Sequence, residues 1–389
     1  MLFVPLQWIF WISCSLIVYV YAGYPLCLWL LTRGRRIAVP PVPADNDLPS
    51  ISLIVAAYNE ERVIEEKLRN CLKLDYPEGK LVCIFVSDST DRTNEILVQY
   101  ESSRIRVQIL EERRGKVAAL AAVFPLCDTE ILVFSDANTL YRPDVLKKLV
   151  RHFSDAEVGV VTGDVRLLPS AQTFGQGEGL YYQYERTLQK LESVFFSTVG
   201  VDGAMYALRR RHLRPVSTGL IADDFVTAMN VALQGYRILY DAEAIAEEDP
   251  TPNDGMEFRR KVRVVAYAVQ SFLAGEGVPP LRQIRLWWPY VSHKLLRWLV
   301  SFMLPAMLVA SVGAAYWSLW WRWILGVEIA FYSAAVVAWK FPRMDALVFR
   351  VPYYFCMVNL AAFLGVLRAL RRGQQAVWAR TERNVRTGI

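Results

Sequence analysis

The sequence is poor in the two residue types that build most structural zinc sites and disulfide frameworks. It has six cysteines and three histidines in 389 residues. The cysteines are scattered without C-x-x-C spacing, and the histidines lie far apart in the sequence. The sequence therefore indicates neither a zinc site nor a disulfide framework.

Two glycine-rich nucleotide-binding loops are also missing. Neither G-x-G-x-x-G nor G-x-x-x-x-G-K-[ST] occurs, so glycine backbones do not cradle phosphates in this chain. A large excess of one charge is absent too: the net charge is +6, and basic residues gather beside apolar segments, as in RGRR (33–36). This pattern favours membrane lipids over nucleic acid as a partner.

No charged residue occurs in the first 32 positions, and the run ends at Arg33. A bilayer core about 30 Å thick needs about 20 apolar residues to cross it. A cleaved signal peptide would open with basic residues and have a shorter apolar centre. We therefore expect residues 1–32 to be a retained transmembrane anchor, with the residues that follow it in the cytoplasm.

Apolar segments return near the other end of the chain. Residues 299–321 and 351–367 are uncharged, and 323–339 contain Glu328 alone. They predict two or three transmembrane segments within 299–370. Three spans would leave the basic tail, 371–389, outside, whereas its charge favours the inside, so the number of spans and the side of the C-terminus stay open.

The segment between these apolar regions has the rhythm of an α/β domain, which we place at residues 48–256. Apolar, β-branched runs alternate with stretches of helical spacing. Such alternation predicts right-handed βαβ units and a mostly parallel, Rossmann-like sheet. Residues 257–298 mix cations with tryptophans and predict amphipathic interfacial helices. The expected strands are 51–57, 81–88, 106–111 and 130–136.

Polar clusters follow three of the expected strands: AYNE (57–60), SDSTD (87–91) and SDANT (135–139). Each alone is most often a turn or a helix N-cap. Because ligands bind at the carboxyl ends of parallel strands, we expect the three clusters to converge on one site. Asp136 and Asn138 can both offer oxygens to a hard cation, and Mg²⁺ commonly takes one or two carboxylates plus phosphate oxygens.

Two charged motifs follow. In ADDF (222–225), Asp223 and Asp224 precede an apolar helix, where acids complement the helix dipole. In EFRRKVRVV (257–265), four cations occur within five residues, as in a basic interfacial helix.

Together these motifs resemble the family-2 glycosyltransferases of GT-A fold, over about residues 50–270. The resemblance is to the membrane-embedded branch, which includes bacterial exopolysaccharide, poly-N-acetylglucosamine and hyaluronan synthases and ceramide glucosyltransferases. It implies an α/β GT-A domain flanked by transmembrane helices in the bacterial inner membrane. It also implies an inverting transfer, dependent on Mg²⁺ or Mn²⁺, from a nucleotide-diphosphate sugar, usually a UDP-sugar.

The resemblance assigns roles to individual residues. On the donor side it places Tyr58 beside the base, Glu60 at the ribose or base, and Asp88 at the base. Asp136 becomes the principal metal ligand, and Asn138 stands where many relatives have a second acid. Asp224 is implied as the general base, beside Asp223. The other residues implied in substrate binding are Arg113, Arg114 and Lys116 in RRGK, Gly203 in VDGA, and Arg260 and Arg263 in RRKVR.

One departure from the family pattern bears on the acceptor. Val264 stands where processive synthases have a tryptophan that caps the acceptor sugar. This favours a single transfer onto a lipid-linked or membrane-proximal saccharide, although Tyr267, or Trp287 and Trp288, could supply the ring. Trp378, Thr381 and Arg383 resemble the tail of exopolysaccharide synthases and favour a processive synthase instead. A non-catalytic nucleotide-binding scaffold is a further alternative, and the oligomeric state stays open.

Overall fold

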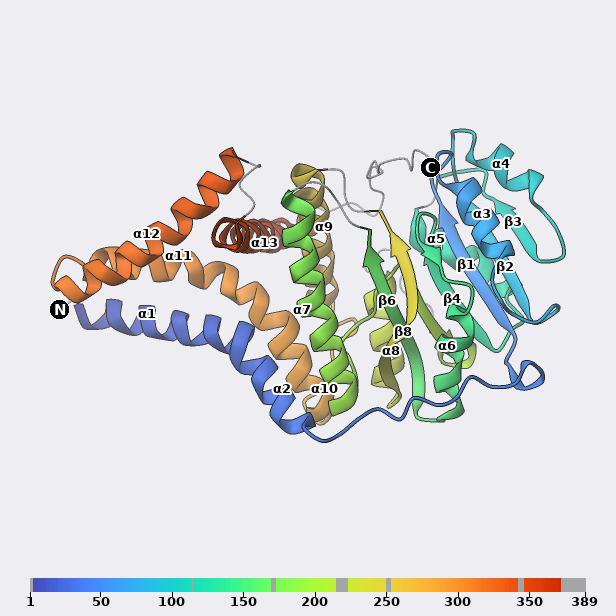
Figure 1. The fold of residues 1–389 in the computed structure, drawn as a ribbon, viewed down its shortest axis with the longest axis horizontal. Coiled ribbons are helices and arrows are strands. Elements are labelled where there is room, and N and C mark those ends of the chain that lie inside the picture. Colours follow the sequence, from blue (N-terminus) through green and yellow to red (C-terminus); the bar gives the residue numbers. More distant parts are fainter. Residues whose placement is uncertain are drawn as a thin grey trace.

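The computed structural model describes residues 3–113, 115–168, 173–214, 223–249, 253–341 and 346–371, with the backbone alone for 173–178 and 223. An α/β domain built on one sheet stands beside a group of long apolar helices (Figure 1). Two helices, α7 (Thr173–Phe195) and α9 (Asp254–Leu273), lie between the two parts in this view. The expected fold class, an α/β domain flanked by helices able to cross a membrane, is confirmed.

The sheet has eight strands in the order β3-β2-β1-β4-β7-β6-β8-β5. Strands β3, β2, β1 and β4 are parallel, β7 is antiparallel to both of its neighbours, and β8 is parallel to β6 and antiparallel to β5. The strands are β1 (Ile51–Ala57), β2 (Leu81–Ser87), β3 (Ile105–Ile109), β4 (Ile131–Asp136), β5 (Leu140–Tyr141), β6 (Val158–Leu167), β7 (Met205–Arg209) and β8 (Arg237–Glu248). The four expected strands are therefore β1 to β4, shifted only at their ends.

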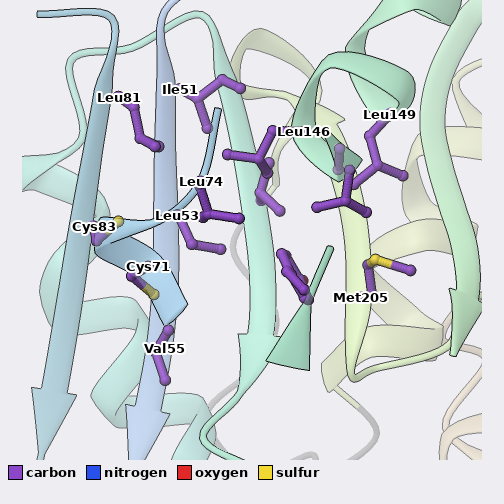
Figure 2. Close-up of a cluster of buried hydrophobic side chains, with 14 of the residues drawn as sticks. Ile51, Leu53, Val55, Cys71, Leu74, Leu81, Cys83, Leu146, Leu149 and Met205 are labelled. Atoms are coloured by element: carbon purple, nitrogen blue, oxygen red, sulfur yellow. The ribbon is translucent and has the colours of Figure 1, made fainter. Parts of the chain in front are cut away.

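Both faces of the sheet are covered by helices, which explains the continuous apolar character of its central strands. Successive side chains of a strand point to opposite faces. Ile51, Leu53 and Val55 of β1 lie in the core beneath α3 and α6 (Figure 2), whereas Ile54 lies in the opposite core beneath α5 and α8. The helices of the domain are α3 (Ile64–Leu72), α4 (Thr93–Gln99), α5 (Lys116–Val123), α6 (Val145–Arg151) and α8 (Asp223–Leu233).

Within the described residues, four helices are long and apolar enough to cross a membrane. Two of them contain a π turn, at Tyr19–Gly23 and at Val291–Leu295, and the Tyr19 hydroxyl is 2.8 Å from Ser292 Oγ. The four helices are Phe3–Thr32, which comprises α1 (Phe3–Val18) and α2 (Tyr24–Thr32); Ile284–Ala314, which comprises α10 (Ile284–Tyr290) and α11 (Leu296–Ala314); α12 (Leu319–Lys340); and α13 (Leu347–Leu370).

The helices at 284–314 differ from the arrangement that we expected from the sequence. We drew a boundary between interfacial helices at 257–298 and transmembrane segments from 299, but one helix crosses it, because α10 continues through the π turn into α11. Arg285, Lys294 and Arg297 interrupt the apolar pattern, and this obscured the continuity of the helix.

Helix α9, which follows the last strand of the α/β domain, packs directly on α13, one of the helices able to cross a membrane. Gly365 of α13 sits so close to α9 that a Cβ atom there would lie 2.8 Å from Val265 Cβ and 2.9 Å from the Val262 carbonyl oxygen. The missing side chain therefore lets the two helices approach each other backbone to backbone. Val262, within RRKVR, lies at this contact between α9 and α13.

Candidate active site

A cavity of about 570 Å³ begins at the carboxyl ends of β1, β2 and β4 and extends to the apolar helices. Tyr58, Asp88 and Asp136 line its sheet end, and Asp224 lines it on the side of α8. Tyr21 and Asn359, from two different membrane-capable helices, line its other end. One continuous space thus joins the three polar strand ends to the membrane-capable helices.

The turn after β1 is tied to the turn after β2 through Asn59. Asn59 is the one non-glycine residue of the described chain with a positive φ, at 55°, a conformation that asparagine tolerates. Its backbone N–H donates to Ser89 Oγ at 2.9 Å, and its own Oδ1 accepts from the Thr90 N–H at 2.8 Å. These bonds fix Tyr58 and Glu60, which flank Asn59 and both line the cavity.

Arg113, Gly115 and Lys116, from the segment RRGK, line the cavity. The Arg113 guanidinium lies 4.2 Å from the centre of the Tyr58 ring. Gly115, with φ at 79°, makes the turn into α5, and its N–H donates to Asp88 Oδ2 at 3.1 Å. The turn directs Lys116 to Asp136, with Nζ 3.0 Å from Oδ1. Arg114 lies outside the described residues.

The expected cation site has two candidate protein ligands, Asp136 and Asn138. Asp136 is the last residue of β4. The side-chain nitrogen of Asn138, Nδ2, donates to Glu248 Oε1 at 3.0 Å, which leaves the side-chain oxygen of Asn138 to act as a ligand. No group of three or more His, Cys, Asp or Glu residues within the described ranges could hold a metal ion. The residues present therefore fit a divalent cation that takes its remaining ligands from a diphosphate, and they do not fit one held by protein alone.

Glu248, which the sequence reasoning did not single out, contacts Asn138. It ends β8, is buried, and faces Asn138 across 110 residues of sequence. The available indication was a pair of acids at the end of a strand, in EEDP (247–250), which resembles the three clusters that were recognised.

Gly203 and Asp224 lie against each other. Asp224 is at the start of α8, where its Oδ1 accepts the Phe225 N–H at 2.7 Å. A Cβ at position 203 would come within 2.1 Å of Asp224 Oδ2. Gly203 therefore provides the space that the Asp224 carboxylate occupies. The side chain of Asp223 is outside the described part of the chain.

On α9, two cations of RRKVR, Arg260 and Lys261, form ion pairs with a buried carboxylate. Glu257, with no exposed surface, accepts two hydrogen bonds from Arg260, at 2.6 and 2.9 Å, and pairs with Lys261 at 3.2 Å. Burial alone would raise the pKa of Glu257, but these two cations outweigh it and lower the pKa to about 2. Arg263 lines the same cavity, and burial lowers its pKa, with Arg260 and Arg368 adding to the effect.

A buried ionic network contributes Glu185, His293 and Arg297 to the lining of the cavity. His293 lies between Glu192, at 2.7 Å, and Glu185, at 3.0 Å, and Glu185 also pairs with Arg297. Tyr24 donates to Glu192 at 2.6 Å. Although burial would raise the pKa of Glu185, Arg297 and His293 hold it well below its usual value. Sequence reasoning missed this network because its hydrogen-bonded partners are about a hundred residues apart or more.

Of the aromatic residues considered for the acceptor, Tyr267 lines the cavity. Trp287 and Trp288 do not line it in the described part of the chain. Trp287 stacks on Tyr290, and Trp288 donates to the Tyr19 hydroxyl at 3.0 Å. The tail residues Trp378, Thr381 and Arg383 lie outside the described ranges.

Comparisons with known proteins agree with this arrangement. The chain is 26% identical over 245 residues to a poly-beta-1,6-N-acetyl-D-glucosamine synthase of Staphylococcus aureus, covering 61% of this chain and 57% of that protein. The synthase of the same name from Staphylococcus epidermidis is 24% identical over 252 residues, with 63% and 59% covered. The chain thus spans less than two thirds of the length of these relatives.

Among solved structures, a mannosyltransferase from Pyrobaculum calidifontis in complex with GDP-Man and Mn²⁺ is similar, with a TM-score of 0.74. The match covers 94% of this chain and 100% of that one at 22% identity, a likeness that shows the fold. The family model described as glycosyltransferase-like family 2 matches residues 49–266, which is more than half of the chain. The chain therefore belongs to the family-2 glycosyltransferases, with a GT-A fold and helices suited to a membrane.

Proposed function

We propose that this protein is a membrane-bound, metal-dependent, inverting glycosyltransferase. It moves a sugar from a nucleotide-diphosphate sugar, preferably a UDP-sugar, to a lipid-linked or membrane-proximal saccharide. One observation carries the proposal: Asp224 shares a single cavity with the cation-binding pair at one end and with membrane-capable helices at the other.

The donor occupies the sheet end of the cavity. Tyr58 and Arg113 offer flat surfaces to the base, and Asp88 accepts one of its N–H groups. Lys116 and Arg263 bind the diphosphate, and Arg260, whose charge Glu257 balances, sets the shape of the wall beside it. The names of the similar proteins support this donor class, because one is a mannosyltransferase solved with GDP-Man.

Asp136 and Asn138 would hold Mg²⁺ or Mn²⁺. When bound, the cation supplies Lewis acidity to the leaving phosphate oxygens. Glu248 acts here through Asn138: by accepting from Nδ2, it keeps the amide oxygen available as a ligand. This role explains how a neutral side chain serves where many relatives have an acid.

Asp224 accepts the proton of the attacking acceptor hydroxyl. The hydroxyl oxygen forms the new glycosidic bond on the face opposite the diphosphate, which leaves with the electron pair of the broken bond. A positioned general base contributes about 10²–10⁴-fold. Lys116 and Arg263 stabilise the charge that develops on the departing diphosphate. The anomeric centre is inverted, and no covalent intermediate forms.

The acceptor reaches Asp224 from the membrane end of the cavity, past Tyr21 and Asn359. Both residues belong to membrane-capable helices, so an acceptor anchored by a lipid can present its sugar there. The basic residues after α2 support an arrangement with the catalytic domain in the cytoplasm, at the inner membrane of a bacterium.

A processive polysaccharide synthase is the second candidate. The names of the similar staphylococcal proteins favour it, as does Tyr267, an aromatic ring on the cavity one turn after Val264. The two candidates differ in the product, because a processive enzyme extends one chain many times before it releases that chain.

The test is a donor panel on the purified full-length protein in lipid nanodiscs, with Mn²⁺ and a membrane-lipid extract as the source of acceptor. We expect one nucleotide sugar to give release of its nucleoside diphosphate and a product larger by one sugar. A ladder of polymers would contradict the single transfer and indicate processive synthesis instead. Absence of release with every donor would contradict the enzyme assignment.

A further inference from the structure

A buried lysine lies directly beneath the proposed cation site. Lys67 of α3 has no exposed surface, and it is among the largest fully buried side chains of the described protein. Its two hydrogen bonds go to neutral oxygens, and the negative charge of Asp136 also acts on its ammonium group. Such burial costs free energy unless hydrogen bonds offset it, and it lowers the pKa of Lys67.

The hydrogen bonds of Lys67 go to the two ends of one short segment. Nζ donates to Ser135 Oγ at 2.7 Å and to the Thr139 carbonyl oxygen at 2.6 Å. The segment between these two residues contains Asp136 and Asn138. One ammonium group therefore joins the residue before the first proposed ligand to the residue after the second.

Neighbouring contacts make this junction rigid. The ammonium lies 4.2 Å from the centre of the Tyr141 ring, a cation–π contact. One turn later on α3, Asn70 exchanges two hydrogen bonds with the Tyr141 backbone, at 2.8 and 2.9 Å. Ser135 Oγ in turn donates to the Asp136 carbonyl oxygen at 3.1 Å. The segment is thus held from beneath by one face of α3.

We propose that Lys67 is a positioning residue for the cation site: by holding Ser135 and Thr139, it sets the separation of the Asp136 and Asn138 oxygens. The inference rests on the proposed metal-dependent function. Mg²⁺ demands nearly ideal octahedral geometry, so a small displacement of either oxygen weakens binding. Groups that orient metal ligands are worth about 10–100-fold in metal affinity or activity.

The test compares Lys67→Met with Lys67→Arg. Methionine keeps the length of the chain and removes the charge and its hydrogen bonds, whereas arginine keeps the charge. Lys73→Met, at the exposed C-terminal end of the same helix, is the matched control. Mn²⁺ affinity is measured by electron paramagnetic resonance on nanodisc-embedded protein with saturating nucleoside diphosphate and no acceptor, so turnover does not enter. Melting temperature and donor kcat/KM are measured in parallel.

We expect Lys67→Met to bind Mn²⁺ about 10–100-fold more weakly, with a melting temperature close to that of Lys73→Met and with Lys67→Arg recovering part of the loss. Equal Mn²⁺ affinity in Lys67→Met and the unchanged protein would overturn the inference. A fall in melting temperature with unchanged Mn²⁺ affinity would also overturn it, because the role would then be structural. If the unchanged protein binds no Mn²⁺ with any nucleoside diphosphate, the proposed function fails and the inference falls with it.

Discussion

Gly203 and Asp224 are fitted to each other, since a single added carbon at position 203 would stand 2.1 Å from a carboxylate oxygen of Asp224. The relationship joins the loop before β7 to the first turn of α8. It gives a direct way to displace the proposed general base without changing its chemistry.

Gly203→Ala should lower kcat by about 10²-fold while donor KM changes little, because the base moves and the donor contacts remain. Steady-state kinetics with varied donor measure both constants. Gly179→Ala is the matched control, since no atom lies within 4 Å of a Cβ at that position on α7. Full activity in Gly203→Ala would mean that the position of Asp224 does not matter for catalysis.

The pairing of Asn138 with Glu248 predicts weak metal binding in the absence of donor. Thermal shift measurements on the unchanged protein should show little stabilisation by Mn²⁺ alone and a clear rise when nucleoside diphosphate is added. Asn138→Asp would place two carboxylates together at the site of the present 3.0 Å contact. The variant should be less stable without metal and should gain more stability from Mn²⁺ alone.

A strong response of the unchanged protein to Mn²⁺ alone would contradict this account of Asn138. So would an Asn138→Asp protein whose melting temperature responds to Mn²⁺ no more than that of the unchanged protein.

Glu257 predicts a defined acid dependence of stability. Its pKa is about 2 in the folded protein and 4.5 in a model compound, so the native state binds fewer protons between these values. The stability that Glu257 contributes is therefore present above pH 4.5 and is lost as the pH falls toward 2, and it amounts to about 3 kcal/mol at most. Glu257→Gln should reduce the slope of unfolding free energy against pH in this window.

The slope will not vanish in Glu257→Gln, because Asp241 contributes in the same direction. Burial would raise the pKa of Asp241, but hydrogen bonds from His152 and the Glu243 backbone, with the charge of Arg151, lower it. Glu66→Gln, on the exposed side of α3, serves as a control for the loss of one carboxylate. An identical slope in Glu257→Gln and in Glu66→Gln would show that the ion pairs of α9 do not contribute in this way.

Asn359 tests the route of the acceptor. It lines the membrane end of the cavity and exchanges weak hydrogen bonds with Tyr21 at 3.3 to 3.4 Å. Asn359→Leu should raise acceptor KM and leave donor KM unchanged, because only the acceptor passes this point. Ser333→Leu, at an exposed position of α12, is the control. A raised donor KM with an unchanged acceptor KM would place the acceptor elsewhere.

The elements that sequence reasoning located are those with a local pattern. The β-branched run at 51–57 and the uncharged residues before Arg33 each bury or insert a continuous apolar surface, so their structure follows from neighbours in sequence. The parallel half of the sheet followed from the alternation of such runs. The antiparallel strand β7 and the two-residue strand β5 did not, because each depends on partners far along the chain.

The same limit applies to the site. Residues next to strand ends, such as Asp88 and Asp136, were located because the position of a strand end is a local property. Glu248 and Lys67 were not recognised as parts of the site, since their importance lies in contacts with Asn138 and with Ser135 across 110 and 68 residues. The sequence alone does not distinguish a buried lysine from a surface lysine, because burial depends on how the helix packs in the fold.

The measurement that tests the central claim most directly compares Asp224→Asn with the unchanged protein in nanodiscs. Donor affinity is measured by calorimetry with Mn²⁺, and turnover is measured as released nucleoside diphosphate in the presence of acceptor. We predict that the variant binds donor as tightly as the unchanged protein and releases nucleoside diphosphate at least about 10²-fold more slowly. Release at the unchanged rate in Asp224→Asn would contradict the assignment of Asp224 as the base and the mechanism built on it.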